Sequence, residues 1–440
     1  MRKKMVAFLL TLFMFSVCGC SNSVDKPTSL PAVSSTTQIE TEPDSYVEIA
    51  GNRYSVQETT KLELRSEHMT YQDIKPIQQL VNLESLELYC EELEDIAPVT
   101  ELRNLKSLTI SSDNLITLNP LTGLINLTEL SLDLGVDSYD KKYDFSFLAN
   151  LNNLKKLTLW DCAIGNTELQ QISQATSLET FILASNGYAD ITDISSLQNL
   201  SNLKFLTLGS ITKATGIASL NTLTNLETLY FEGGALSALP SMPSLSVLGC
   251  GGHHVDHRLS AQFPSLKEFS VDLDEGESDL SYLSNYPTLN KLSLRHGKLS
   301  NSNIASVGKL SNLTNLQIFD CGATDFSFLS SLNNLKVLEI YNSPIADLTP
   351  IQQLADLKAL SLDYCSISDI SFASGLKNLK YLSLTNNDIK EISPLFNLNG
   401  LEVLDLKDNK GLLPSQKDIM KDKNPNCSFA TCDITWNRDF

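Results

Sequence analysis

The chain has 440 residues, of which 42% are hydrophobic and 19% are charged, as in an ordinary folded protein. Lys and Arg number 33 against 52 Asp and Glu, so the formal net charge is −19. A surface this acidic argues against nucleic acid as a partner and against flat docking on anionic lipid, and it permits a basic protein partner.

The N-terminal twenty residues are typical of an export signal. Basic residues at positions 2–4 precede an apolar run, 5–17, that is too short to span a bilayer comfortably. The run ends in Val17-Cys18-Gly19-Cys20, which resembles the lipobox of bacterial lipoproteins. The resemblance implies that residues 1–20 are a lipoprotein signal peptide and that a lipid on Cys20 anchors the protein to the outer side of a bacterial membrane. The alternative is a plain secretory signal with incidental cysteines.

A spacer and a hairpin are predicted next. Residues 21–45 are rich in Ser, Thr and Pro with almost no large apolar side chain, which is typical of a disordered tether. Within residues 46–56, two short alternating runs flank Gly51-Asn52. This pattern predicts a β-hairpin that caps the first structural unit.

A repeated pattern, L-x-x-L-x-L-x-x-N-x-I, runs from about residue 56 to about residue 413. Its units start at Leu83, Leu105, Leu127, Leu154, Leu178, Leu203, Leu226, Leu245, Leu266, Leu289, Leu313, Leu335, Leu357, Leu379 and Leu401, after a partial unit at Leu62-Glu-Leu64. Apolar fourth and sixth positions alternate with polar ones, which predicts a short strand with one buried face. No unit can bury its leucines alone, so the units must stack into one solenoid with a concave parallel sheet about 75 Å long.

The second half of many units shares the form of Asp95-Ile-Ala-Pro98 and Glu391-Ile-Ser-Pro394. With the first half, this resembles the leucine-rich repeat of bacterial internalin-like surface proteins, except between about 133 and 310, where unit lengths vary. The resemblance implies an α/β leucine-rich-repeat solenoid over 46–413, with 3-10, short helical or loop returns on the convex face. It also implies an adhesin or interaction module without enzymatic activity. Residues 414–440 lose the repeat, which predicts a C-terminal cap.

Seven cysteines follow Cys20, and the repeat explains most of them. The ninth position holds Cys162, Cys321 and Cys365, the sixth holds Cys250, and the eighth holds Cys90. We expect the first four to behave as small buried apolar residues and Cys90 to lie nearer the surface. In the cap, Cys427 and Cys432 are either disulfide partners, as export would allow, or two reduced thiols.

Metal sites and catalysis have little support in the sequence. Residues 253–257 bring three imidazoles and a carboxylate together, but the repeat phase points His253 toward the buried turn and His254 away from it. We therefore predict no metal ion. The Walker, HExxH, GxSxG and GxGxxG motifs do not occur, so neither a cofactor nor an enzymatic reaction is predicted.

Aromatic side chains on the predicted concave face carry the functional signal. They are Tyr89, Trp160, Tyr230, Phe319 and Tyr341 at the fifth and seventh positions, Phe205 and Tyr381 at the third, and Tyr364 at the eighth. Among them lie the carboxylates of Glu87, Asp133, Asp161, Glu232, Asp272, Asp320, Glu339, Asp363 and Asp405. Aromatic residues dominate interface hot spots, so this face suits a protein or peptide with basic and apolar features. Strand propensity alone also favours aromatic residues here.

Three hypotheses about the ligand follow from this face. The leading one is an unidentified protein ligand, from a host or from the cell envelope. A glycan ligand would stack on the same aromatics, with Trp160 and Tyr230 as the first suspects. A structural role in the envelope would require partners from the same cell and little dependence on these aromatics.

Overall fold

A computed structural model of the protein describes residues 45–135, 141–184, 191–211, 213–233, 236–252, 259, 263–273 and 279–429. The predicted signal peptide with Cys20, nearly all of the predicted tether, the segment 253–257 and Cys432 lie outside the described residues. Within the described ranges, no helix is both long enough and apolar enough to cross a membrane.

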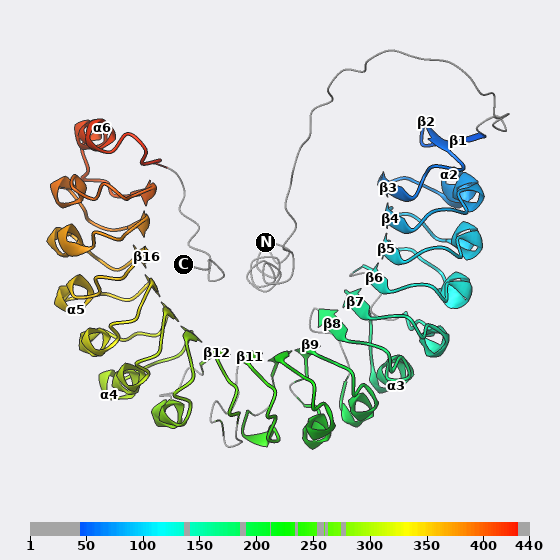
Figure 1. The fold of residues 1–440 in the computed structure, drawn as a ribbon, viewed down its shortest axis with the longest axis horizontal. Coiled ribbons are helices and arrows are strands. Elements are labelled where there is room, and N and C mark those ends of the chain that lie inside the picture. The colour runs from blue at the N-terminus through cyan, green and yellow to red at the C-terminus, as the bar shows by residue number, and fades with distance from the viewer. Residues whose placement is uncertain are drawn as a thin grey trace, which may run out of the picture.

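One parallel sheet of 16 strands organises the structure, and each strand pairs with the next one along the chain. The strands are β3 (Lys61–Arg65), β4 (Ser85–Tyr89), β5 (Ser107–Ser111), β6 (Glu129–Asp133), β7 (Lys156–Trp160), β8 (Thr180–Ala184), β9 (Phe205–Ser210), β10 (Thr228–Glu232), β11 (Val247–Gly251), β12 (Glu268–Asp272), β13 (Lys291–Arg295), β14 (Asn315–Phe319), β15 (Val337–Tyr341), β16 (Ala359–Asp363), β17 (Tyr381–Ser383) and β18 (Val403–Asp405). The strands line the inner side of an arc, with helical returns outside (Figure 1). This arrangement confirms the predicted solenoid.

Short helices return the chain along the convex side. The α-helices are α2 (Tyr71–Ile74), α3 (Asn166–Ile172), α4 (Asn301–Ile304) and α5 (Thr349–Gln352). The 3-10 helices are η1 (Lys75–Gln79), η2 (Ala97–Glu101), η3 (Asn119–Gly123), η5 (Ser146–Asn150), η6 (Ser195–Asn199), η7 (Ile217–Thr222), η8 (Leu236–Ala238), η9 (Ser281–Asn285), η10 (Ala305–Lys309), η11 (Ser327–Ser331), η12 (Ser371–Gly375) and η13 (Ser393–Leu395).

The acidic residue of the repeat starts many of these returns. Asp95 accepts a hydrogen bond from the Ala97 backbone N–H (2.8 Å), and Asp347 accepts one from Thr349 (2.9 Å). The bonds to Thr349 hold the pKa of Asp347 below its ordinary value. The carboxylate satisfies an N–H that the first helical turn leaves unpaired. The next position can be Pro, as at Pro98, because an N–H there would also have no partner within the helix.

In many units an asparagine just before the first leucine ties the unit to its predecessor. The side-chain amide of Asn104 donates to the Val81 carbonyl (2.9 Å), and that of Asn378 donates to the Ala355 carbonyl (3.0 Å). Where the units are most closely spaced in sequence, the Ser244 hydroxyl donates a bond of the same kind (2.7 Å). These bonds join equivalent turns of successive units and so help to hold the spacing of the stack.

The turn after each strand decides which side chain completes the core. In the C-terminal units the eighth residue is left-handed, as at Asp320 (φ 52°) and Asn342 (φ 50°), and the ninth turns inward. The buried amide oxygen of Asn387 accepts bonds from the backbone N–H groups of Cys365 (3.1 Å) and Ile367 (2.9 Å). The ninth side chain therefore satisfies backbone groups that water does not reach.

Four cysteines lie in the core as predicted. Cys162, Cys321 and Cys365 are buried at the ninth position and Cys250 at the sixth. Burial raises the pKa of Cys321 and of Cys365 to about 12. The thiols therefore stay protonated and pack as small apolar groups.

The prediction that Cys90 lies near the surface is wrong, because this side chain is fully buried. Between residues 52 and 134 no residue has a positive φ, so the strand alternation continues one step further and the eighth side chain points inward. The Cys90 N–H donates to the Ser111 carbonyl (2.9 Å), and its Sγ lies 3.7 Å from Met69 Sδ. Ser112 and Leu134 are buried at the same position of the next two units.

A single apolar core runs from one end of the stack to the other. At the N-terminal end, β1 (Tyr46–Ile49) and β2 (Asn52–Ser55) form an antiparallel hairpin that buries Val47 and Ile49. At the C-terminal end, α6 (Pro414–Lys423) buries Met420. Beyond α6, Ser428 bonds to β18, accepting from the Leu404 N–H (2.9 Å). Both ends of the core are thus covered within the described chain.

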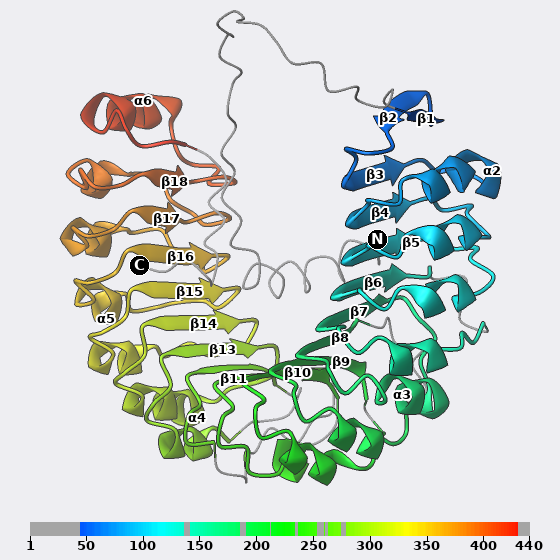
Figure 2. The ribbon, with the colours of Figure 1, turned by 45° about the vertical axis from the view of Figure 1, so that its right-hand side comes forward.

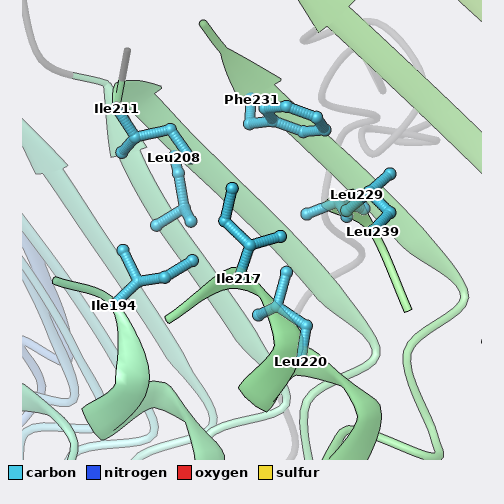
Figure 3. A pocket seen from close by; sticks show the side chains of 8 residues that line it. All are labelled: Ile194, Leu208, Ile211, Ile217, Leu220, Leu229, Phe231 and Leu239. Atoms are coloured by element: carbon cyan, nitrogen blue, oxygen red, sulfur yellow. The ribbon is translucent and has the colours of Figure 1, made fainter. Parts of the chain in front are cut away.

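A small packing gap lies in the core where the sheet is irregular. The register between β9 and β10 shifts at Phe231/Glu232. A cavity beside this shift is lined by Ile194, Leu208, Ile211, Ile217, Leu220, Leu229, Phe231 and Leu239 (Figure 3). It has room for about one water molecule and offers that water no polar partner. The cavity is a packing gap and not a ligand pocket.

Candidate ligand-binding face

The concave face consists of the third, fifth and seventh positions of each unit. In β4, Ser85, Glu87 and Tyr89 are half-buried on this face, whereas Leu86 and Leu88 lie in the core. Parallel pairing aligns equal positions of successive strands into rows, and these strands lie side by side along the inner side of the arc (Figure 2). A ligand in the concavity would therefore meet those row residues that reach solvent, which on β14–β16 are mainly the seventh positions, and not the leucines.

Tyr89, near the N-terminal end, is already covered by the chain itself. The guanidinium of Arg65 on β3 lies 3.8 Å from the centroid of the Tyr89 ring, and Arg65 also pairs with Glu63. The Tyr89 hydroxyl donates to Glu87 (2.8 Å). The ring and the hydroxyl of Tyr89 are thus both engaged within the protein.

Phe205 and Tyr230 meet in the middle of the sheet. Their ring centroids lie 5.9 Å apart with the planes at 56°. The Tyr230 ring also lies over Gly249 on the next strand, where an added Cβ would come within 2.2 Å of Tyr230 Cδ1. Burial raises the pKa of the Tyr230 hydroxyl far above its ordinary value. Tyr230 is therefore part of the floor of this face, and glycine at 249 makes room for it.

Charged residues beside Tyr230 largely compensate one another. Arg295 pairs with Asp272 (3.0 Å) and donates to Ser270 (2.9 Å), and its side chain is only 12% exposed. Glu232 reaches solvent but lies deep in the arc, where desolvation and then the charge of Asp272 raise the pKa of its carboxyl. The guanidinium of Arg295 is therefore engaged in an ion pair within the protein.

Three aromatic rings gather on β14–β16 and the turn that follows. Phe319 and Tyr341 have centroids 6.2 Å apart, and Tyr341 and Tyr364 have centroids 5.1 Å apart. Tyr364 is 45% exposed and left-handed at φ 57°, which is uncommon for a bulky residue. We call Phe319, Tyr341 and Tyr364 the aromatic cluster. Strands β14–β18 contain no Lys or Arg, but they do carry Glu339, Asp363 and Asp405.

The two remaining aromatics stand apart from this cluster. Trp160 lies on β7, and its register neighbours are Asp133 and Ala184. Tyr381 on β17 packs against Val337 and Ala359 and donates its hydroxyl to Glu402 (3.0 Å). The eight predicted aromatics therefore form separate groups and not one continuous surface.

Several of the other predicted sites lie outside the residues that the structure describes. Cys427 is buried, but Cys432 lies outside the described residues, so their pairing stays a prediction. The same holds for lipidation of Cys20 and for the absence of a metal at 253–257. Within the ranges described above, no cluster of His, Cys, Asp or Glu is suited to a metal ion.

Sequence reasoning missed the two interactions that most change this face. In one of them, the guanidinium of Arg65 covers the Tyr89 ring. In the other, the Tyr230 ring occupies the space that a side chain at position 249 would take. The available signals were basic and aromatic residues at equal positions of adjacent units, and glycine at a row position beside a tyrosine.

Several known proteins resemble this chain. Residues 355–397 match the family model of Leucine Rich repeats (2 copies). A Leptospira interrogans leucine-rich-repeat protein, LIC12759, is 20% identical over 85% of this chain and 96% of its own, with a TM-score of 0.54. The internalin inlF from Listeria monocytogenes is 22% identical over 87% of this chain and 91% of its own, with a TM-score of 0.41. No curated protein matches the chain by sequence.

The fold is that of a leucine-rich-repeat solenoid. The evidence for this is the 16-stranded parallel sheet, the helical and 3-10 returns, and the likeness to LIC12759. Solenoids of this class are typically non-catalytic scaffolds that bind other proteins across an extended concave surface.

The close packing of Tyr230 over Gly249 makes a testable prediction for stability. Gly249→Ala forces the Tyr230 ring out of its place, and we expect it to lower the free energy of unfolding in urea by about 1–3 kcal/mol. Gly251→Ala is the matched control, because its Cβ would lie 3.4 Å from Asp272, an ordinary contact. We expect Tyr230→Ala to absorb most of the Gly249→Ala effect when the two are combined. Additive effects, or equal costs at 249 and 251, would contradict this packing.

Proposed function

We propose that this chain is a lipid-anchored surface protein that binds a protein partner through the concave face of its solenoid, chiefly at the aromatic cluster. The observation that supports it best is the combination on β14–β16 of three neighbouring rings, one of them 45% exposed, with carboxylates and no strand Lys or Arg. Aromatic side chains bury a large area at little cost in conformational entropy, which makes them effective anchors.

The scaffold favours binding because it is ordered before a ligand arrives. The strands of the cluster pair in register, and their leucines belong to the continuous core. A ligand that binds such a face does not have to order it, so less of the binding free energy is lost. The row positions vary from unit to unit while the leucines do not, so they are where specificity for a partner would reside.

The chemistry of the face indicates the kind of partner. A carboxylate-bearing surface with aromatic anchors complements a protein segment with basic and apolar side chains. The glycan alternative would rely on Trp160 and Tyr230, but the Tyr230 ring already lies against Gly249. An envelope-organising role would use the same solenoid with partners from the same cell. We favour a protein partner because the aromatic cluster contains Tyr364, the one of the eight predicted aromatics that is exposed and not half-buried.

The proposed lipid anchor would place the solenoid close to a membrane. A lipid on Cys20 and a tether of about 25 residues would hold the solenoid roughly 25–30 Å from the membrane surface. Two or more acyl chains, at about 0.8 kcal/mol per buried methylene, give stable membrane attachment. The concave face would then be presented to partners outside the cell membrane.

Loss of the aromatic cluster should abolish partner capture. We expect the soluble chain from residue 46 onward to cross-link a discrete protein partner, and the triple variant Phe319→Leu, Tyr341→Leu, Tyr364→Leu to bind it about 100-fold more weakly, since each hot-spot ring contributes upwards of 1 kcal/mol. The matched control is Tyr89→Leu with Trp160→Leu, which should capture the partner normally. Equal capture by both variants would place recognition elsewhere, provided that both unfold at the wild-type denaturant concentration.

Removal of the lipidation site should release the protein from the membrane. In a bacterial host, we expect the wild-type chain in the membrane fraction and a Cys20→Ala variant in the soluble or secreted fraction. Mass spectrometry of the N-terminal peptide should find acyl groups on Cys20 of the wild type. A wild-type protein that is cleaved elsewhere and found free of lipid would support the plain secretory signal instead.

A further inference from the structure

The N-terminal end of the concave face shows how this protein holds a cation against an aromatic ring. The guanidinium carbon of Arg65 lies 3.8 Å from the centroid of the Tyr89 ring. Glu63 pairs with Arg65, and Glu87 accepts the Tyr89 hydroxyl (2.8 Å). The electron-rich ring face and the nearby carboxylates both stabilise the positive charge.

The aromatic cluster contains the same components. The Tyr341 and Tyr364 rings are 5.1 Å apart with their planes at 56°, so they form two walls at an angle. Asp363 is the register partner of Tyr341 on the next strand, and the Asp320 backbone N–H donates to the Tyr341 carbonyl (3.1 Å). Burial, the neighbouring Tyr364 and these two carboxylates raise the pKa of the Tyr341 hydroxyl. Two anionic groups therefore act at this ring.

One of the two carboxylates is held firmly in place. Asp363 accepts hydrogen bonds from the Ser361 hydroxyl (2.9 Å), the Ser383 hydroxyl (2.7 Å) and the Thr385 backbone N–H (2.7 Å). All three donors are neutral, so these bonds orient the carboxylate without cancelling its charge. A positioned anion beside two ring walls favours a cation that also presents apolar or planar surface.

The strands of the cluster supply no such cation. Arg295 is the register neighbour of Phe319, but its guanidinium pairs with Asp272 (3.0 Å) and donates to Ser270 (2.9 Å). Beyond Asp363, the next basic residue at a seventh position is Lys407, two units further along the sheet. Tyr89 has Arg65 at the seventh position of the preceding strand. Tyr341 and Tyr364 have no Arg at that position of the strand before them.

We infer that Tyr341 and Tyr364, together with Asp320 and Asp363, form a subsite that receives the guanidinium group of an arginine side chain from the partner. The inference rests on the proposed function and names the group that the aromatic cluster recognises. Arginine fits better than lysine because its planar guanidinium stacks on rings while it donates to carboxylates. In this subsite the partner's arginine takes the role that Arg65 has at Tyr89.

The test uses the full chain in a neutral detergent and two fluorescein-labelled probes, tetra-arginine amide and its uncharged isostere tetra-citrulline amide. Fluorescence anisotropy at one ionic strength measures the Kd of each probe. We expect tetra-arginine to bind more tightly, and Tyr341→Leu/Tyr364→Leu to weaken it about tenfold while preserving every charge of the protein. Tyr89→Leu is the matched control and should leave the Kd within about twofold, since Arg65 already covers that ring.

Two results would overturn the inference. If the double variant binds tetra-arginine as the wild type does, attraction to the acidic surface alone explains binding. If tetra-citrulline binds as tightly as tetra-arginine and both depend on the two tyrosines, the cluster accepts planar groups without regard to charge. Either result is distinguishable from failure of the proposed function, which is judged by capture of the protein partner with the triple variant. A wild-type unfolding midpoint for the double variant excludes misfolding as the cause of a loss.

Discussion

The solenoid and its concave face depend on one constraint, which is that a unit can bury its leucines only against its neighbours. Stacking brings strands into register, and it also encloses backbone groups at the turn after each strand. The inward ninth side chain satisfies these groups, as Asn387 does for Cys365 and Ile367. The left-handed eighth residue makes this possible, and where it is absent the eighth side chain, such as Cys90, fills the core instead.

The same constraint leaves the concave rows free to differ from unit to unit. The chain uses part of that freedom internally, since Arg65 covers Tyr89, Tyr230 fills the place above Gly249, and Arg295 pairs with Asp272. The C-terminal third of the sheet is different, because its rings and carboxylates have no Lys or Arg within their own strands. Because Arg65 and Arg295 already engage groups of the chain itself, whereas strands β14–β18 contain no Lys or Arg, we place the proposed binding site on β14–β16.

The sequence was informative wherever a rule acts within one unit. The alternation around Leu86 and Leu88, the unit spacing and the Asp-Ile-x-Pro form together predicted the strands, the solenoid and the returns. It was less informative where two units meet, because a pattern within one unit does not show which side chains touch across strands. The contact of Tyr230 with Gly249 is of this kind. The burial of Cys90 was missed because a left-handed residue after the strand decides whether the eighth or the ninth side chain turns inward, and the repeat pattern does not show that this residue is absent here.

The most direct test of the proposed binding site is site-specific photo-cross-linking on the concave rows. A photoreactive amino acid would replace Thr385, beside Asp363 in the C-terminal third, or Ser111, beside Tyr89 in the N-terminal third. We expect the partner captured by the wild type to cross-link from position 385 and not from position 111. Cross-links from position 111 alone, or from neither position while capture persists, would contradict it.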